Sequence, residues 1–362
     1  AGRSRLLGLV DQHPGFSRDG DVGEEGAPKE VDAGGAVDGN QDEDAMTYLF
    51  LANRLIHDFR TTAITVAEEM SGMPGLASPV EMGGIGFDYR LAMGVPDIWI
   101  KLVKEVADEN WELGYLLHEL TQHRPEERVV SYCESHDQAL VGDKTLIFRL
   151  ADAEMYTSMS LSTPSLVIDR AVALHKMIRL FTFIAAGGGY LTFMGNEFGH
   201  PEWIDFPREG NGWSYKYARR QWSLAENSLL RYQHLNEFDR AMIMTGKEYD
   251  LPGLQFTETI TVNNADKIIA FKRGNLITVM NFNPSVSFTG YGIPVKGKFR
   301  IILNTDDPLF GGQGRIDTSQ TYFSVPDHGH YGVTAPHHLK LYLPARTAMV
   351  LVQEQVKSIY SL

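Results

Sequence analysis

The sequence has 362 residues, of which 43% are hydrophobic and 22% charged, and its formal net charge is −13. This balance predicts a globular chain with a sizeable core, and the negative charge disfavours nucleic acid as a partner because acidic surfaces repel phosphate backbones. The single cysteine, Cys133, excludes a disulfide framework and a cysteine-based zinc site, as expected of a protein in a reducing compartment. Because no apolar run of about 18 residues is present, we expect no membrane partner.

Residues 1–40 differ in composition from the rest of the chain. They contain nine glycines, eight acidic residues and one aromatic residue, Phe16. Such a segment buries too little apolar surface to offset the entropy that is lost on ordering. We therefore expect loop or disorder in this segment, and the folded chain to begin near residue 41.

From residue 41 to about 247, helical and strand patterns alternate. Apolar residues at helical spacing predict helices near 44–59, 96–106, 168–178 and 229–242. Short apolar runs predict buried strands at 63–67, 128–133 and 190–194. This order is typical of a parallel sheet with helical crossovers. Polar residues follow each strand, at the end where such sheets place their active sites.

The hydrophobic period changes after residue 247. Short strands that are separated by Gly, Asn and Pro are predicted at 268–271, 276–282, 299–303 and 349–352. We therefore predict two folded domains, an α/β domain over residues 41–247 and an all-β domain over residues 248–362.

Motifs of other enzyme classes are incomplete. His118 and His123 lie five residues apart, about 500° of helix, so they face different directions and do not form the zinc site of an HExxH protease. The pair Gly84 and Gly86 lacks the third glycine of a dinucleotide fingerprint, and no G-x-S-x-G nucleophile elbow occurs. We therefore expect no metal site and no cofactor.

Two carboxylates stand just after predicted strands. Glu68 follows the strand at 63–67, and Asp137 follows the strand at 128–133, with His136 beside it. Carboxylates at the rim of a barrel can donate a proton and stabilise an oxocarbenium-like transition state, as glycoside chemistry requires. These residues alone leave a second interpretation open, in which the carboxylates cap a helix or pair with an arginine such as Arg90.

Long motifs surround these carboxylates. They are Ala67-Glu68-Glu69-Met70-Ser71-Gly72-Met73-Pro74-Gly75, Gly84-Ile85-Gly86-Phe87-Asp88-Tyr89-Arg90, Glu134-Ser135-His136-Asp137-Gln138 and Gly195-Asn196-Glu197-Phe198-Gly199-His200. In this order they resemble motifs of the eukaryotic-type 1,4-α-glucan (glycogen and starch) branching enzymes of the α-amylase superfamily. The resemblance, which begins near Asp42, implies the C-terminal portion of a (β/α)₈ barrel followed by an all-β sandwich domain.

The resemblance also implies a reaction and roles for residues. A branching enzyme is a glycosyltransferase that cleaves an α-1,4 bond with retention and passes the chain to a 6-hydroxyl, which forms an α-1,6 branch. Glu68 matches the general acid/base, Asp137 the transition-state stabiliser and His136 a hydroxyl-binding neighbour. The implied partner is an α-1,4-glucan (glycogen, amylose or amylopectin), in the cytoplasm or, for starch, in a plastid. Supporting or glucan-contacting roles are expected for Asn196, Glu197 and His200. Trp203 is expected either to stack on a sugar face or to be a packing residue.

The sequence departs from the family at the nucleophile. The family carries it as an aspartate in an Arg-Phe-Asp strand end before the acid/base, and the residues that precede Glu68 have no match to that pattern. We therefore expect the chain to be a fragment that is inactive by itself. The alternative is a catalytically inactive glucan-binding or scaffold protein that keeps the rim without the nucleophile.

Overall fold

The computed structural model describes residues 42–141, 144–201, 205–216, 218–254, 256–326 and 335–354. The chain divides into two units, one containing the residues up to Leu91 together with Pro125–Glu127, and the other containing Ala92–Arg124 and the residues from Arg128 onward. The segment 1–40 and Trp203 lie outside the described residues.

The first unit contains one long helix and a pair of short parallel strands. Asp42 caps the helix because its carboxylate accepts hydrogen bonds from two amides of the first turn. The parallel pairing agrees with the predicted type of sheet, although only two residues of the predicted strand at 63–67 are paired. The elements are α2 (Glu43–Phe59), β1 (Val66–Ala67), η2 (Val80–Met82) and β2 (Tyr89–Leu91).

Helix α2 confirms the predicted helix near residues 44–59, but its apolar stripe is exposed. The buried side chain of this helix is Asn53, whose amide donates to the carbonyl of Ile85 at 3.1 Å. The helix therefore packs through a polar contact on the face opposite its apolar stripe. The amphipathic pattern predicted that this face would be exposed to solvent. The exposed stripe consists of Tyr48, Leu51, Leu55 and Phe59.

The second unit begins with helices around a second parallel pair of strands, β3 and β4. The alternation of helix and strand that the sequence predicts is confirmed, and the structure adds helices that the sequence analysis did not predict. The elements are α3 (Gly94–Glu105), η3 (Asp108–Asn110), α4 (Leu113–Thr121), β3 (Val129–Ser131), η4 (Asp137–Val141, a π-helix), α5 (Leu146–Ala151), η5 (Asp152–Tyr156), α6 (Leu166–Ala185), β4 (Gly189–Tyr190), η6 (Asn196–Phe198), η7 (Glu209–Asn211), α7 (Ser223–Glu226), α8 (Tyr232–Glu248) and η8 (Leu251–Gly253).

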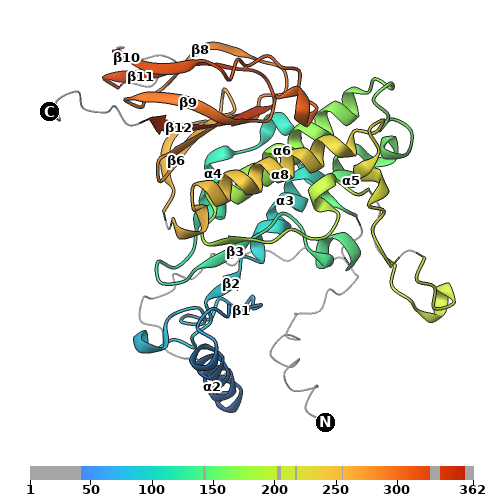
Figure 1. Cartoon of the computed structure of the whole chain (residues 1–362), viewed down its shortest axis with the longest axis vertical. Helices are drawn as coiled ribbons and strands as arrows, with labels where there is room; N and C mark the ends of the chain where they lie inside the picture. Colours follow the sequence, from blue (N-terminus) through green and yellow to red (C-terminus); the bar gives the residue numbers. More distant parts are fainter. Residues whose placement is uncertain are drawn as a thin grey trace, which may run out of the picture. The chain divides into compact units, whose positions relative to one another are not determined.

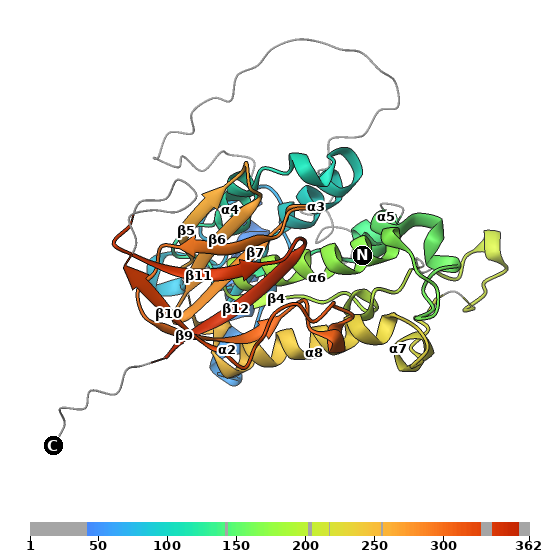
Figure 2. The same ribbon diagram turned by 90° about the horizontal axis from the view of Figure 1, so that it is seen from above.

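Helix α6 forms the centre of the second unit. It runs beside α8, and both helices contact the large sheet, as Figures 1 and 2 show. Most side chains of α6 are buried, and its Phe181 lies 6.2 Å from the ring of Trp99 on α3. Trp99 is 0% exposed, and its indole nitrogen donates to Thr182 at 2.8 Å. A buried indole with its N–H satisfied fixes α3 against α6.

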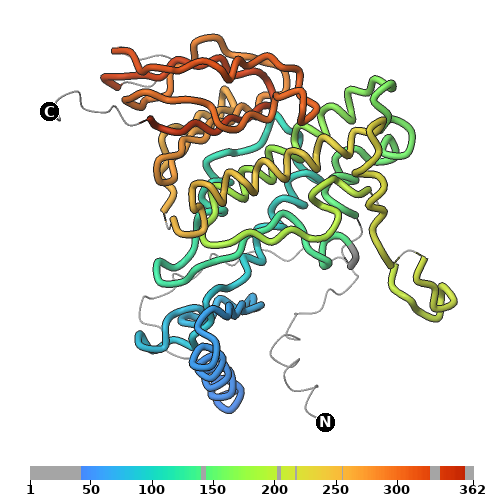
Figure 3. The backbone as a smooth tube through the Cα atoms, in the orientation of Figure 1, coloured from blue at the N-terminus to red at the C-terminus, as the bar shows by residue number. Residues whose placement is uncertain are grey.

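The all-β part folds as a sandwich from a single eight-stranded antiparallel sheet. Figure 3 follows the chain from α8 into this sheet, whose strand order is β5-β6-β7-β12-β9-β10-β11-β8. Apolar side chains from β6 and β7 share one buried cluster with those from β8 and β11, so the two ends of the sheet pack face to face. The strands are β5 (Glu258–Asn263), β6 (Ile268–Arg273), β7 (Leu276–Asn281), β8 (Phe288–Ile293), β9 (Lys298–Asn304), β10 (Thr321–Pro326), β11 (His337–Leu343) and β12 (Thr347–Glu354).

Helices and sandwich share one core in the second unit. A single buried apolar cluster runs from the helices into β6, β7, β9 and β12. Arg273 at the end of β6 is 2% exposed and donates to the carbonyls of Ile184 (3.0 Å) and Leu251 (2.8 Å). It also donates to the carbonyls of Ala186 and Leu254. The buried guanidinium of Arg273 thus donates hydrogen bonds to four backbone carbonyls of the helical part.

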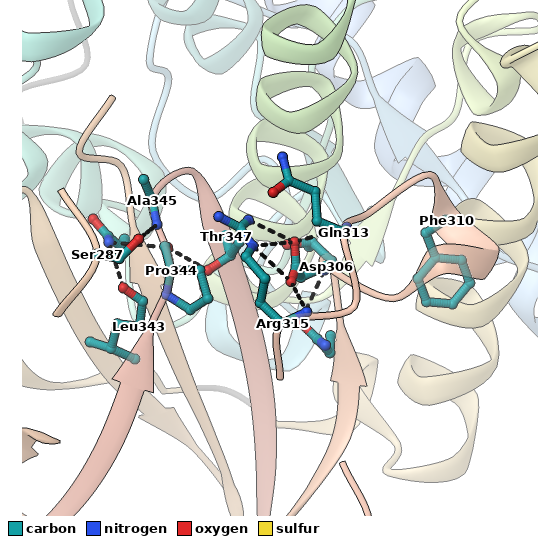
Figure 4. Close-up of polar contacts among 12 residues, drawn as sticks. Ser287, Asp306, Phe310, Gln313, Arg315, Leu343, Pro344, Ala345 and Thr347 are labelled. Carbon is teal, nitrogen blue, oxygen red and sulfur yellow. Dashed lines mark hydrogen bonds and ion pairs between the residues drawn. The ribbon is translucent and has the colours of Figure 1, made fainter. Parts of the chain in front are cut away.

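The loop after β9 is organised by one buried carboxylate. Asp306 is 2% exposed, and its oxygens accept from the amides of Gln313 (3.2 Å) and Arg315 (2.7 Å) (Figure 4). The side chain of Arg315 adds an ion pair at 2.7 Å. These bonds close residues 306–315 into a compact loop, which contains the short helix η9 (Pro308–Phe310).

Lys176 of α6 joins the helical part to the same loop, and its burial makes the stability of the fold depend on pH. It is 2% exposed, and its ammonium donates to the carbonyls of Thr305 (2.6 Å) and Phe310 (2.7 Å). Burial lowers the pKa of Lys176 to about 7, although Asp306 and Asp307 act in the opposite direction. Above pH 7 the unfolded chain therefore holds a proton that the folded chain has lost, so stability rises with pH.

We expect the free energy of unfolding to rise by about 2 kcal/mol more in the wild type than in Lys176→Met between pH 7 and pH 9, because one pKa unit corresponds to about 1.4 kcal/mol. Unfolding can be followed by the fluorescence of Trp99 and Trp111, both 0% exposed. Lys247→Met, at an exposed lysine of α8, is the control and should keep the wild-type pH dependence. Parallel curves for the wild type and Lys176→Met would contradict the prediction.

Among the helices of the described segments, none combines the length and the apolar character that crossing a membrane requires.

Candidate functional site

Glu68 lies directly after β1 in the first unit. Its side chain is exposed, and among the described residues no hydrogen bond or ion pair to its carboxylate is found. The preceding residue, Ala67, is buried and pairs with Arg90 in the register of β1 and β2. The strand is therefore followed by a side chain that is accessible to a substrate.

Arg90 holds the loop that follows Glu68. Its guanidinium forms ion pairs with Glu69 and with Glu127, the second at 2.9 Å between Nη1 and Oε2. It also donates to the carbonyl of Met73 at 3.0 Å. Arg90 is 11% exposed and Glu127 is 2% exposed, so water screens this pairing weakly. Arg90 thus pairs with the neighbour of Glu68 and leaves Glu68 itself available.

Asp88 fixes the other end of β1. One of its oxygens accepts from the amide of Thr65 at 2.7 Å and lies 2.9 Å from Nε2 of His57 on α2. The amide of Asp88 donates in return to the carbonyl of Thr65 at 3.0 Å. These contacts tie the helix to the start of the strand, so the strand that carries Glu68 is held at both ends.

Asp137 and His136 belong to the second unit, where they follow β3 at the start of η4. The side chain of Asp137 is 43% exposed, that of His136 is 58% exposed, and Nε2 of His136 lies 3.3 Å from Oδ1 of Asp137. The amide of Asp137 donates to the hydroxyl of Ser135 at 3.2 Å. A carboxylate and an imidazole thus stand side by side at an accessible strand end, where they can face a charged transition state and a sugar hydroxyl.

Glu134 is a functional candidate that sequence reasoning did not assign. Its carboxylate is 2% exposed, and its oxygens accept from the amide group of Asn196 at 2.6 Å and from the backbone amide of Leu146 at 2.5 Å. Burial raises the pKa of Glu134, against the effect of these two hydrogen bonds. Asn196 is itself 4% exposed, so its side chain bonds within the protein.

Glu197 lies on the 3₁₀ turn η6, next to Asn196. One of its oxygens accepts from the amide of Gly195 at 2.7 Å, and burial raises the pKa of its carboxyl group. The carbonyl of Glu197 lies 3.5 Å from the guanidinium of Arg179, which is 0% exposed and forms an ion pair with Asp239 on α8. The backbone of the turn therefore contacts an ion pair whose guanidinium is fully buried.

His200 is buried against Arg220. It is 3% exposed, and its Nδ1 lies 3.2 Å from the guanidinium of Arg220, which also donates to the carbonyl of Met194 at 2.7 Å. Gly195 is required here, because its φ is +96° and a Cβ would lie 2.7 Å from Nε of Arg220. This packing directs His200 into the protein interior.

The structure therefore brings together some of the predicted site residues. Within the second unit, Glu134 connects the Asp137 segment to Asn196, and Glu197 follows Asn196 directly. Glu68 lies in the first unit. The predicted roles of all these residues stay predictions, and Trp203 lies outside the described residues. Among the described residues, no three His, Cys, Asp or Glu side chains converge as metal ligands do.

The residues that sequence reasoning missed act through contacts across long separations. The bond between Glu134 and Asn196 spans 62 residues, and the pair of Arg179 with Asp239 spans 60. Glu134 stands in the same motif as Asp137 and was visible as a polar residue after a strand. What identifies its partner is the fold, because β3 and β4 are adjacent and both end at this place.

Comparison with known proteins finds close relatives. The chain is 52% identical over 313 residues to a protein of Rhizophagus irregularis named 1,4-alpha-glucan-branching enzyme, an alignment that covers 86% of this chain and 45% of that protein. Proteins with the same name from Felis catus (52% identity, 86% and 44% coverage) and Candida glabrata (48%, 95% and 51%) are similar to it. The Candida glabrata alignment extends past the segment 42–362 to which the motifs limited the resemblance.

Two further comparisons concern the fold. Residues 260–354 match the family model described as "Alpha amylase, C-terminal all-beta domain". The fold is similar to that of a debranching enzyme from Nostoc punctiforme (TM-score 0.52, 16% identity, 84% of this chain and 55% of that chain) and to an α-amylase from Geobacillus thermoleovorans (0.51, 11%, 86% and 57%). The predicted portion of an α/β barrel followed by a β sandwich is confirmed, and so is the predicted resemblance. The chain spans about half the length of the curated relatives it matches.

Proposed function

Since this chain resembles the eukaryotic-type 1,4-α-glucan branching enzymes, at 52% identity to one relative, we propose that it carries part of the catalytic site of such an enzyme. The observation that carries the proposal is the presence of Glu68 and Asp137, both accessible, within the motifs that the resemblance covers. The proposed substrate is an α-1,4-glucan.

Each residue has a proposed step in a retaining transfer. Glu68 protonates the departing glycosidic oxygen and then removes the proton of the attacking 6-hydroxyl. Asp137 stabilises the positive charge that develops on the sugar ring, and His136 binds a hydroxyl of the same sugar. The covalent step also needs a nucleophile, and the Arg-Phe-Asp pattern that carries it in the family does not occur in this sequence.

The second candidate function is glucan binding without catalysis, which the missing Arg-Phe-Asp pattern favours. Both candidates use the same accessible rim residues, and they differ in whether new α-1,6 linkages appear. For the location we propose the cytoplasm, with a plastid as the alternative, and the support is that Cys133, the single cysteine, is buried and free.

The test compares this chain with a longer protein in which it is joined to the part of the Rhizophagus irregularis relative that it does not match. Each is incubated with amylose, and branches are detected by iodine staining and by analysis of debranched chains. We expect branching from the longer protein alone, and a loss of about 10²–10⁴-fold in its rate in Glu68→Gln, because the general acid is removed.

Glu105→Gln, at an exposed carboxylate that ends α3, serves as the matched control and should branch at the parent rate. If the longer protein bound amylose without branching it, the second candidate function would replace the first. If Glu68→Gln kept the parent rate, the assignment of Glu68 as acid/base would be wrong.

A further inference from the structure

Glu134 is a carboxylate at a strand end that is turned away from the surface. It lies between β3 and Asp137, and its side chain is 2% exposed, whereas the carboxylate of Asp137 three residues later is 43% exposed. Burying a carboxylate is costly unless hydrogen bonds satisfy it. The buried carboxylate of Glu134 is therefore expected to have hydrogen-bond partners that offset the cost of its burial.

The two carboxylate oxygens of Glu134 accept hydrogen bonds from donors in two different segments. Oε1 accepts from the side-chain amide of Asn196 on η6, and Oε2 accepts from the backbone amide of Leu146 in the first turn of α5, at 2.6 and 2.5 Å. The carboxylate thereby connects β3, α5 and the turn after β4. A side-chain donor on one oxygen and a backbone donor on the other fix its position and its rotation.

The residues that follow Glu134 in the chain are joined by hydrogen bonds of their own. The amide and the hydroxyl of Ser135 both donate to Oε1 of Gln138, at 2.9 and 3.1 Å. The hydroxyl of Ser135 accepts from the amide of Asp137 at 3.2 Å, and Gln138 donates onward to Asp97 of α3 at 3.0 Å. Hydrogen bonds therefore hold the amide of Asp137 and the side chain of the residue after it, while the carboxylate of Asp137 stays accessible.

We propose that Glu134 is a positioning residue for Asp137: by bridging Asn196 and Leu146 it holds the segment 135–138 in the geometry with which His136 and Asp137 meet a glucan. This inference rests on the proposed function. It also gives Asn196 a different role from direct glucan contact, because its 4% exposed amide acts on the substrate through Glu134.

The experiment uses the chain as it exists and measures two properties of each variant. The first is amide hydrogen exchange at residues 136–139, and the second is the affinity for maltoheptaose. In Glu134→Leu, which makes neither bond, we expect exchange to accelerate and affinity to fall, each about tenfold, as the loss of hydrogen bonds to a charged group predicts.

Conservative and compensating variants separate positioning from stability. In Glu134→Gln, one oxygen still accepts from Leu146, and the new amide donates to Asn196 once the Asn196 amide has rotated. Both properties should then stay within about threefold of the wild type. Glu134→Leu combined with Asn196→Leu removes both partners of the Glu134–Asn196 bond, so the melting temperature should recover in part while exchange and affinity stay altered.

Thr145→Ala is the matched control. Thr145 caps the same helix end by accepting from the amide of Phe148 at 3.3 Å, so its loss should lower the melting temperature and leave exchange at 136–139 unchanged. Wild-type exchange in the double variant, or in a folded Glu134→Leu, would overturn the proposal. If exchange responds as expected but the wild type does not bind maltoheptaose, Glu134 still positions the segment, and it is glucan binding by this chain that fails.

Discussion

Replacing Arg179 with methionine is expected to lower the free energy of unfolding of the second unit by about 3–5 kcal/mol, because the change leaves a largely buried carboxylate without its counter-ion. Arg179 is 0% exposed, and its partner Asp239 is 19% exposed. The same guanidinium also lies 3.5 Å from the carbonyl of Glu197. Denaturant unfolding, followed by the fluorescence of the buried Trp99 and Trp111, measures the change.

A double variant identifies the source of this loss. Asp239→Asn alone should also be strongly destabilising, whereas Arg179→Met with Asp239→Asn should cost less than the sum of the two changes because no buried charge is left unpaired. Arg240→Ala, at the exposed neighbour of Asp239 on α8, is the control and should change stability by less than about 0.5 kcal/mol. Strict additivity of the two single changes would show that the pair is not coupled.

In the first unit, Arg90→Met is expected to have an effect of similar size, about 3–5 kcal/mol, since it leaves Glu127 buried and unpaired. The carbonyl of Met73 and the carboxylate of Glu69 lose their partner as well. The change should appear in the amide exchange of Asp88 and Tyr89, which donate to the carbonyl of Thr65 at 3.0 and 3.2 Å.

The control for Arg90 lies on α2. Arg54 forms an ion pair with Asp58 in which both side chains are more than half exposed, so Arg54→Met should cost less than about 1 kcal/mol. An equal response to the two substitutions would mean that the burial of Glu127 is not what makes Arg90 important. Adding Glu127→Leu to Arg90→Met should recover part of the lost stability.

Amphipathic periodicity predicted the helices of this fold where an apolar stripe faces a core. The predicted helix near 168–178 lies within α6, and the predicted helix near 229–242 overlaps α8. For α2 the same periodicity gave the right helix, but the stripe is exposed and the buried residue is Asn53. Periodicity reports which residues share a face, and only the tertiary structure decides what that face meets.

Short elements were harder to predict. Helix α4 was missed although Leu113, Leu116, Leu117 and Leu120 give it a buried stripe, because the same stretch was read only as an incomplete zinc motif. The strand predicted at 190–194 is observed as β4, Gly189–Tyr190. The approach of Gly189 to Val130, where a Cβ would lie 3.0 Å away, allows this pairing and is not visible in a hydrophobic pattern.

The sequence likewise indicated the surroundings of some candidate site residues and not of others. Position after a strand predicted Glu68, His136 and Asp137 as site candidates, and the structure places all three just after β1 and β3 with side chains at least partly exposed. It gave no sign that Asn196 and His200 turn inward, since their partners Glu134 and Arg220 are contributed by other segments. A polar residue near an active site serves either the substrate or the scaffold, and the choice depends on contacts that are distant in sequence.

The four carbonyls that converge on Arg273 have a consequence for evolution by domain exchange. A sandwich that carries a guanidinium buried at 2% exposure fits a neighbour that presents carbonyls at the positions of Ile184, Ala186, Leu251 and Leu254. Grafted onto a barrel without those acceptors, the same sandwich would bury an unsatisfied cation. We therefore expect the helical part and the sandwich to be inherited together. Recombination between lineages should be tolerated within either part rather than at the boundary between them.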